Sequence, residues 1–245
     1  MWDWILKIAA LLGIGGISLT QVISDDKKSW IALGAFLLLL LYVGYRLIRT
    51  ISKRLDAKYP KGYLPISTIA RMATTDGKNL VYETTRHIQV KRPTMRHFEH
   101  RFFWTGTKDP RVTSSLQMPS KIDCIDGEKT KLVKLKFPMT RVYDEVEVIH
   151  VRMDIDDSDQ QSATYVSHTV DAPVTLISWR IELPYVTDRY FGSKASIYRT
   201  AINHQGHPAE ERLETVVFDA VAKSFSFDLT HPEPGYRYTL AWPRP

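Results

Sequence analysis

Residues 224–242 read SFSFDLTHPEPGYRYTLAW, and apolar and polar side chains alternate on either side of THPEPG as they do in β-strands. Successive strand residues point to opposite faces, so the apolar side chains gather on one face of each strand. Two prolines and a glycine between the strands indicate a turn. We therefore predict a β-hairpin with an aromatic core, or alternatively rings that stack on a ligand base. The apolar side chains are Phe225, Phe227, Tyr236, Tyr238, Leu240 and Trp242.

The same strand pattern extends upstream to about residue 70. Valine, isoleucine, threonine and aromatic residues dominate these segments, and Pro, Gly, Asp and Asn interrupt them. This predicts an all-β domain over residues 70–245, either a β-sandwich (Ig-like among others) or a barrel, and two Greek-key halves dividing near Pro184 would also fit. Further strands are predicted at residues 80–85, 96–105, 131–137, 142–153, 164–170, 174–183, 196–202 and 215–218, with a helical turn near 209–213.

Two apolar segments precede the strands. Residues 30–48, WIALGAFLLLLLYVGYRLI, match the roughly 20 residues that a helix needs to cross a bilayer, and aromatic residues lie near both ends. Residues 4–23 form a second candidate span, although they contain Lys7 and three glycines. A cleaved signal peptide is the alternative for residues 4–23, but Asp3 and the lack of an A-x-A site argue against cleavage. We predict a two-span transmembrane hairpin over residues 1–50.

Positive charge is concentrated directly after the second apolar segment. Residues 46–61 contribute +5 of the net charge of +6, and residues 62–245 contribute +1. Positive charge collects on the cytoplasmic side of membrane spans, so we expect a multi-pass inner (plasma) membrane protein with a cytoplasmic C-terminal domain. The basic residues at this membrane interface recur at helical spacing, and they either set the topology or also bind anionic lipids. They are Arg46, Arg49, Lys53 and Arg54.

Residues 51–69 are predicted to be a basic stem and linker, because Pro60, Gly62 and Pro65 break the helix. Within the spans, small residues recur at a spacing of four, which lets helix backbones approach closely. Such contacts serve either packing within the hairpin or self-association of several copies into a homo-oligomer. The small residues are Ala9, Gly13, Gly16 and Thr20.

A stretch of the β domain combines basic and aromatic residues. Residues 71–111 hold nine basic and four acidic side chains, and residues 86–104 contain the sequence RHIQVKRPTMRHFEHRFFW. On an extended strand, Arg96 shares a face with Phe98, His100, Phe102 and Trp104. Guanidinium groups suit phosphate and aromatic rings suit bases, so this stretch is the candidate ligand site, a solvated strand face being the alternative. The candidate ligand residues are Arg86, Arg92, Arg96, Arg101 and Trp104.

The sequence contains no recognisable catalytic or cofactor-binding motif, so we expect no enzyme activity and no cofactor. His97 and His100 fall on opposite faces of a strand, His204 and His207 lie in a loop, and the acidic residues 154–159 lack the glycine of a calcium loop. We therefore predict no metal site. Cys124 is the single cysteine, which excludes an intramolecular disulfide, and we expect a small buried side chain there.

The order of these parts resembles the two-transmembrane, β-rich effectors of bacterial anti-phage defence, such as those of cyclic-oligonucleotide signalling. The resemblance is architectural and covers the two apolar segments, the basic stem and the strands after residue 70. It implies a β domain that senses a nucleotide second messenger or a protein partner, and spans that self-associate and disrupt the inner membrane. A membrane-tethered adaptor without membrane-damaging activity is the alternative. Membrane lipids are expected partners, whereas a DNA or RNA polymer is not, because the excess charge lies in the stem.

Overall fold

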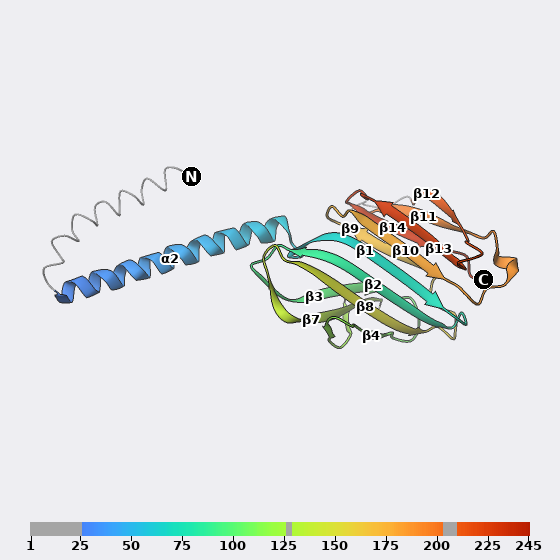
Figure 1. Ribbon diagram of the computed structural model, residues 1–245, viewed down its shortest axis with the longest axis horizontal. Helices are drawn as coiled ribbons and strands as arrows, with labels where there is room; N and C mark the ends of the chain where they lie inside the picture. The colour runs from blue at the N-terminus through green and yellow to red at the C-terminus, as the bar shows by residue number, and fades with distance from the viewer. Residues whose placement is uncertain (1–25, 126–128, 203–209) are drawn as a thin grey trace. The chain divides into compact units, whose positions relative to one another are not determined.

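The structure is a computed structural model that describes residues 26–125, 129–202 and 210–245. The chain divides into two compact units, Met1–Ala57 and Lys58–Pro245. In the described residues, a single long helix precedes a domain built of β-sheet (Figure 1). The all-β character predicted from the alternating pattern is confirmed.

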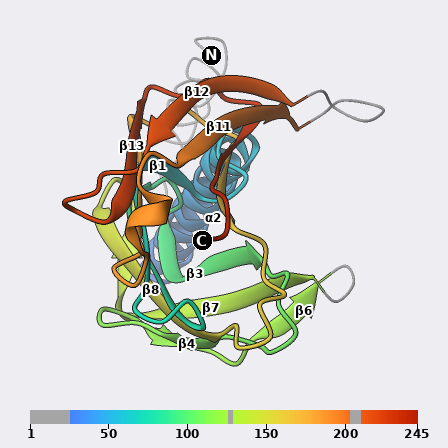
Figure 2. The same cartoon turned by 90° about the vertical axis from the view of Figure 1, so that its right-hand side faces the viewer.

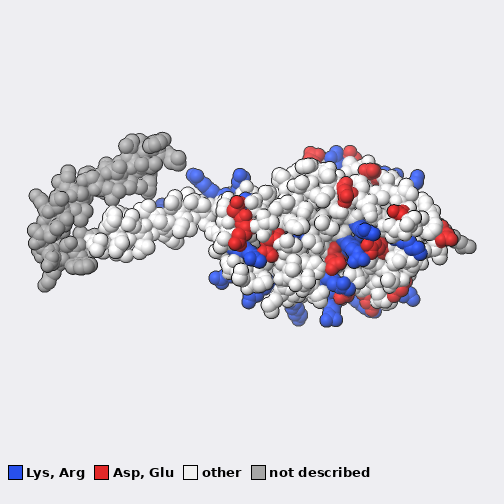
Figure 3. Space-filling model, in the orientation of Figure 1, with Lys and Arg blue, Asp and Glu red and all other residues white. Residues whose placement is uncertain are grey.

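Helix α2 runs from Asp26 to Lys58 and includes the predicted span at residues 30–48. Its leucines are exposed on all sides, as Leu38 at 68% and Leu41 at 71% illustrate, and such uniformly apolar helices are typical of membrane spans. By length and composition, Leu33–Lys58 is the one helix of the described residues that can cross a membrane. Figure 3 shows α2 as a mainly uncharged surface with Lys and Arg side chains towards its end. The other predicted span, residues 4–23, lies outside the described residues.

Three sheets make up the β domain. The long sheet has the order β13-β10-β1-β2-β8-β4, and a second sheet, here the β9 sheet, has the order β12-β11-β14-β9. The third, here the β3 sheet, has the order β3-β7-β5, with β6 also paired to β7. All neighbouring strands are antiparallel except β1 and β10.

The strands have the following bounds. In the long sheet they are β13 (Ser224–Thr230), β10 (Leu176–Glu182), β1 (Tyr63–Thr74), β2 (Asn79–Val90), β8 (Val146–Asp156) and β4 (Arg111–Thr113). In the β9 sheet they are β12 (Glu211–Val217), β11 (Lys194–Ala201), β14 (Tyr236–Ala241) and β9 (Tyr165–Val170). In the β3 sheet they are β3 (Thr94–Phe103), β7 (Thr130–Val142), β5 (Met118–Pro119) and β6 (Asp123–Ile125).

One face of the long sheet carries two separate cores. The β13–β10–β1 half packs on the β9 sheet around Trp179, which is 1% exposed and stacks on Phe227 at 6.3 Å between ring centroids. The β2–β8 half packs on the β3 sheet around the fully buried Phe98. Tyr82 of β2 packs against both clusters. Figure 2 shows β11 and β12 above, β3 and β7 below, and the long sheet beside them. The two shorter sheets therefore cover different halves of one continuous sheet.

The C-terminal hairpin predicted from SFSFDLTHPEPGYRYTLAW is wrong. Both strands form, but β13 pairs with β10 in the long sheet, whereas β14 pairs with β11 and β9. The five-residue connection, 231–235, carries the chain from one layer to the other, with positive φ at His231 and Gly235. The predicted faces are confirmed, because Phe225, Tyr238 and Leu240 are buried in the same core. β13 and β14 lie in two sheets that face each other, so their apolar side chains meet in one core although the strands are not paired.

Three further expectations differ from the structure. Strand β1 begins at Tyr63, inside the predicted linker, and accommodates Pro65 beside a register shift. A division near Pro184 is wrong, since β10 and β13 are neighbours in one sheet. The helical turn expected near residues 209–213 is replaced by β12 from Glu211 onwards. Pairing with the adjacent strand of the chain overrides the local signals in two cases, because β1 pairs with β2 from Tyr63 onwards and β12 pairs with β11.

Candidate functional site: a basic cavity between two sheets

A large cavity lies over the middle of the long sheet. It has a volume of about 840 Å³ and is lined by the long sheet, by β3 and by β9. Its floor includes Tyr82 and Arg86 of β2 together with Met153 and Ile155 of β8. The cavity exists because the β3 and β9 sheets each cover one half of the long sheet, which leaves the strip between them open.

Arg86 lies on this floor without a countercharge. In β2 the side chains of Thr84 and Ile88 are buried, and Arg86 lies between them on the same face. Its Nε atom is buried and has no hydrogen-bond partner. No described carboxylate forms an ion pair with it. A guanidinium in this position provides several fixed donors, and leaving them unpaired is unfavourable. The site therefore favours an anionic ligand group such as a carboxylate or a phosphate.

Two histidines of the lining lie close enough to Arg86 to be affected by its charge. His100 of β3 is 1% exposed, and neither ring nitrogen has a hydrogen-bond partner. Burial, and secondarily Arg86 and His168, hold the pKa of His100 well below its usual value. Burial, and then Arg86 and Lys61, lower the pKa of His168 on β9 to about 3. Both imidazoles are therefore neutral at pH 7, and each can donate one N–H to a bound anion.

The lining is basic overall. Arg92, Arg101, Arg237 and Lys61 join Arg86, and Glu99 is the only carboxylate among the lining residues. Glu99 accepts a 3.3 Å hydrogen bond from Arg101, and Lys61 pairs with Asp171 outside this cavity. Burial is also the main cause of the raised pKa values of Tyr63 and Tyr82, so both phenols remain neutral. The field inside the cavity is therefore attractive to anions.

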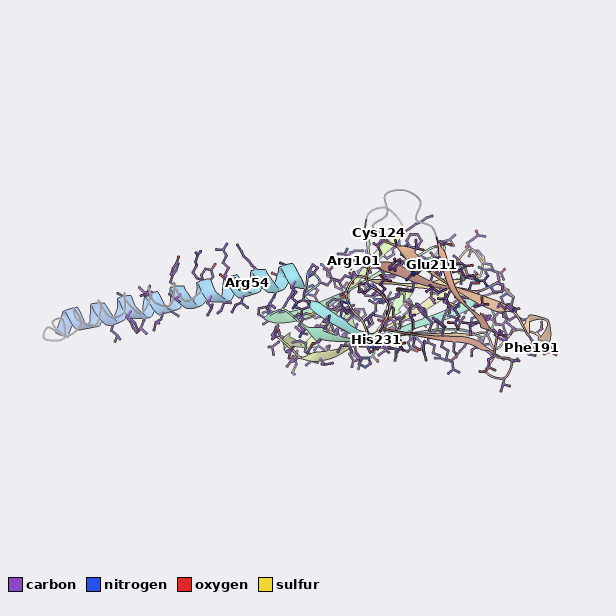
Figure 4. All side chains as sticks on the ribbon, turned by 90° about the horizontal axis from the view of Figure 1, so that it is seen from above. Arg54, Arg101, Cys124, Phe191, Glu211 and His231 are labelled. Atoms are coloured by element: carbon purple, nitrogen blue, oxygen red, sulfur yellow. The ribbon has the colours of Figure 1, made fainter. Side chains whose placement is uncertain are left out.

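Four of the five predicted ligand residues line this cavity: Arg86, Arg92, Arg101 and Trp104. Arg96 does not, because the ladder between β3 and β7 shifts register between Met95 and His97. The shift leaves Arg96 exposed, whereas Phe98 and His100 are buried. Figure 4 labels Arg101 on the β domain and Arg54 on α2. The four residues come from β2, from β3 and from the segments that follow these strands.

The remaining predicted positions are distributed as follows. Arg46, Arg49, Lys53 and Arg54 are all exposed on α2, which continues past the apolar segment as their spacing predicts. Ala9, Gly13, Gly16 and Thr20 lie outside the described residues, as do His204 and His207. In the described residues no three His, Cys, Asp or Glu side chains are placed to hold a metal ion.

The expectation of a buried Cys124 is wrong. The thiol is exposed at the end of the β3 sheet, where the Lys131 ammonium lies 3.3 Å from its sulfur (Figure 4). Strand β6 has only three residues, so few neighbouring side chains of the β3 sheet cover the thiol. The acidic segment 154–159 forms ion pairs with neighbouring cations, among them Lys108 with Asp156 at 2.5 Å. The interpretation of that segment as an acidic solvated turn is only partly right, because Asp154 and Asp156 lie in β8, Asp157 is buried, and the turn is at residues 158–159.

Sequence reasoning missed Lys61, His168 and Arg237, which complete the lining. None lies in the basic-aromatic stretch. His168 and Arg237 reach the cavity through the pairing of β9 with β14, and no local pattern reveals that pairing.

No family model matches this chain, and no curated protein matches it in sequence. Among solved structures, the M1 zinc metallopeptidase from Deinococcus radiodurans bound to Tyr-Ser-Ala is 11% identical, with a TM-score of 0.37 over 74% of this chain and 42% of that one. Native yeast LTA4 hydrolase is 10% identical, with a TM-score of 0.41 over 74% of this chain and 29% of that one. Baculovirus P35 is 9% identical, with a TM-score of 0.32 over 75% of this chain and 98% of that one. This chain therefore spans less than half of the length of either the metallopeptidase or the LTA4 hydrolase.

Proposed function

We propose that this protein is a membrane-anchored sensor and effector of bacterial anti-phage defence. In this proposal the cytoplasmic β domain binds an anionic ligand or partner in the basic cavity. The N-terminal spans then self-associate and disrupt the inner membrane. The observation that carries the sensing part is Arg86, a cation without a countercharge on the floor of a cavity of about 840 Å³. The apolar helix α2, followed by exposed basic residues, supports the membrane part.

The test separates the anchor from the sensor. The native chain, a chain with residues 1–50 replaced by an unrelated two-span anchor, and the Arg86→Gln variant are expressed in bacteria at matched levels. Membrane potential and survival are followed during phage challenge. We expect depolarisation and protection with the native chain and neither with the other two. Depolarisation that persists in Arg86→Gln would disconnect the cavity from the output.

A membrane-tethered adaptor remains the second candidate, and the same experiment distinguishes it. The free edges of the shorter sheets favour it, because exposed strand edges can pair with a partner protein. If the anchor replacement protects as well as the native chain and neither depolarises, the N-terminal segment serves only as a tether. In that case, loss of protection in Arg86→Gln would indicate that the cavity binds the partner protein.

A further inference from the structure

Two unpaired strand edges face the basic cavity. β3 ends its sheet and β9 ends the other, so each is paired on one side only within the described residues. The cavity lining includes five consecutive residues of β9, 165–169, and six consecutive residues, 99–104, from the end of β3 and just after it, together with His97. Successive side chains of a strand point to opposite faces of its sheet, so a strand that met the cavity with one face would contribute only every second residue. A run of consecutive lining residues therefore indicates that the edge of the strand borders the cavity.

Hydrogen bonds show which backbone groups of β9 are unpaired. Trp242 N–H donates to the carbonyl oxygen of Thr164 at 3.1 Å, which places Thr164 in a hydrogen-bonded pair with the β14 side. Every second residue of an antiparallel strand has the same role. Val166 and His168 therefore bond to β14, whereas the N–H and C=O groups of Tyr165, Ser167 and Thr169 point to the free edge. All three of these residues line the cavity.

The two edges differ in charge. The same reasoning from the Trp104 N–H to Lys129 carbonyl bond, 2.9 Å long, directs the backbone of Glu99 and Arg101 to the free edge of β3. Charged residues are typical of edges that are protected from pairing. The outward residues of β9 carry no formal charge. β9 is therefore the edge that can accept another strand, and Arg86 of β2 supplies a cation on the cavity floor beside it.

We propose that an extended acidic segment of a partner protein adds to β9 as a fifth strand of the β9 sheet and places a carboxylate against Arg86. The six residues of β9 offer an edge of about 20 Å for this pairing. Within the described residues, Arg86 and Arg237 of the lining form no ion pair, and Glu99 is the single lining carboxylate, which favours an acidic segment over a basic or neutral one. The proposal rests on the proposed sensing function and identifies its trigger as a protein segment.

The test begins with the full chain in lipid nanodiscs, against which a displayed library of random nonapeptides is selected, with empty nanodiscs as the counterselection. We expect enriched sequences with an alternating pattern and at least one Asp or Glu. In an added strand, every second backbone N–H faces β9 and the others face away from it. Synthetic copies of the enriched peptides should therefore lose about tenfold or more in affinity when the amides that face β9 are N-methylated, and little when the other amides are. This result needs no protein variant and so does not depend on the folding of a mutant.

Two variants of the chain complete the test. Ser167→Pro removes an N–H that points to the free edge and leaves the β14 ladder intact, so binding should weaken about tenfold while Ser167→Ala binds normally. Arg86→Gln should lower the affinity for acidic peptides about tenfold. It should change little the affinity for the same peptides with Asn or Gln in place of the acidic residue. Peptides that bind equally well to native chain and Ser167→Pro would overturn the inference, and so would a library without enrichment.

A nucleotide arm separates this inference from the proposed function. ATP and cyclic di-AMP are titrated against the same nanodiscs. If either binds in an Arg86-dependent manner and no peptide is enriched, the cavity senses a nucleotide, so the inference fails and the proposed function stands. If neither nucleotides nor peptides bind, both fail.

Discussion

Arg86 of β2 and His100 of β3 face one cavity from two sheets that share no strand. Burial and the guanidinium's charge together keep this imidazole neutral, and His168 of β9 is held in the same way. The cavity therefore has the fixed Arg86 cation on its floor and a neutral imidazole from each of the two shorter sheets, and each ring can donate a hydrogen bond to an anion.

Acid should destabilise the β domain through these histidines. The pKa of His168 is lowered to about 3, against 6.5 when unfolded, so the unfolded chain binds the proton first as pH falls. Between pH 6.5 and 4.5 each such histidine should cost at most about 1.4 kcal/mol of stability per pH unit. Thermal unfolding should show a smaller loss of Tm over this range in His168→Asn. The same change at the exposed His231 is the matched control.

The buried face of β3 should control stability, whereas its exposed face should not. Phe98 is 0% exposed and Phe103 is 54% exposed. Phe98→Ala should destabilise the domain by about 3–5 kcal/mol because it removes a packed ring, and Phe103→Ala by less than about 0.5 kcal/mol. Chemical denaturation measures both. Equal losses would mean that β3 is not oriented as described.

Gly62 should tolerate no side chain. Its φ is +76°, and an added Cβ would lie 2.2 Å from Nε of Arg92. Gly62→Ala should therefore cost more than the roughly 1–2 kcal/mol of backbone strain alone. Gly235→Ala is the matched control, since φ is +93° there and no atom lies within 4 Å. Calorimetry on the two variants compares them, and similar losses would show that Arg92 moves aside freely.

Cys124 makes the topology measurable without engineering. It is the only cysteine of the chain and is exposed on the β domain. If that domain is cytoplasmic, a membrane-impermeant maleimide should label Cys124 only after spheroplasts are permeabilised. Cys124→Ser should remain unlabelled in both conditions. Labelling of intact spheroplasts would place the domain outside and contradict the topology expected from the basic stem.

Residue patterns predicted what depends on neighbours in the chain. Alternation located most strands and the buried faces of β13 and β14, since burial requires only a regular period of two. The helical spacing of Arg46, Arg49 and Lys53 likewise predicted that α2 continues beyond its apolar segment.

Strand partners were beyond local reasoning. The turn at THPEPG indicated a hairpin, but packing of Phe227 on Trp179 belongs to a pairing with β10. Pro60, Gly62 and Pro65 suggested a linker, yet β1 begins at Tyr63 because β2 supplies its partner there, and β10 joins on the other side from Ser67 onwards. The candidate site shows the same division. The basic stretch pointed to Arg86, whereas His168 joins it only through tertiary structure.

The position of β1 has a consequence for biosynthesis. β1 is the first strand to leave the ribosome after α2, and its hairpin partner β2 follows directly. Its parallel partner does not, since Ser67 pairs with Leu176, more than a hundred residues later. Translation at about 5–20 residues per second therefore leaves one edge of β1 unpaired for seconds. A chain cut short before β10 would carry the apolar helix attached to an incomplete sheet with an exposed edge, a product prone to aggregate and a natural substrate for quality-control proteases.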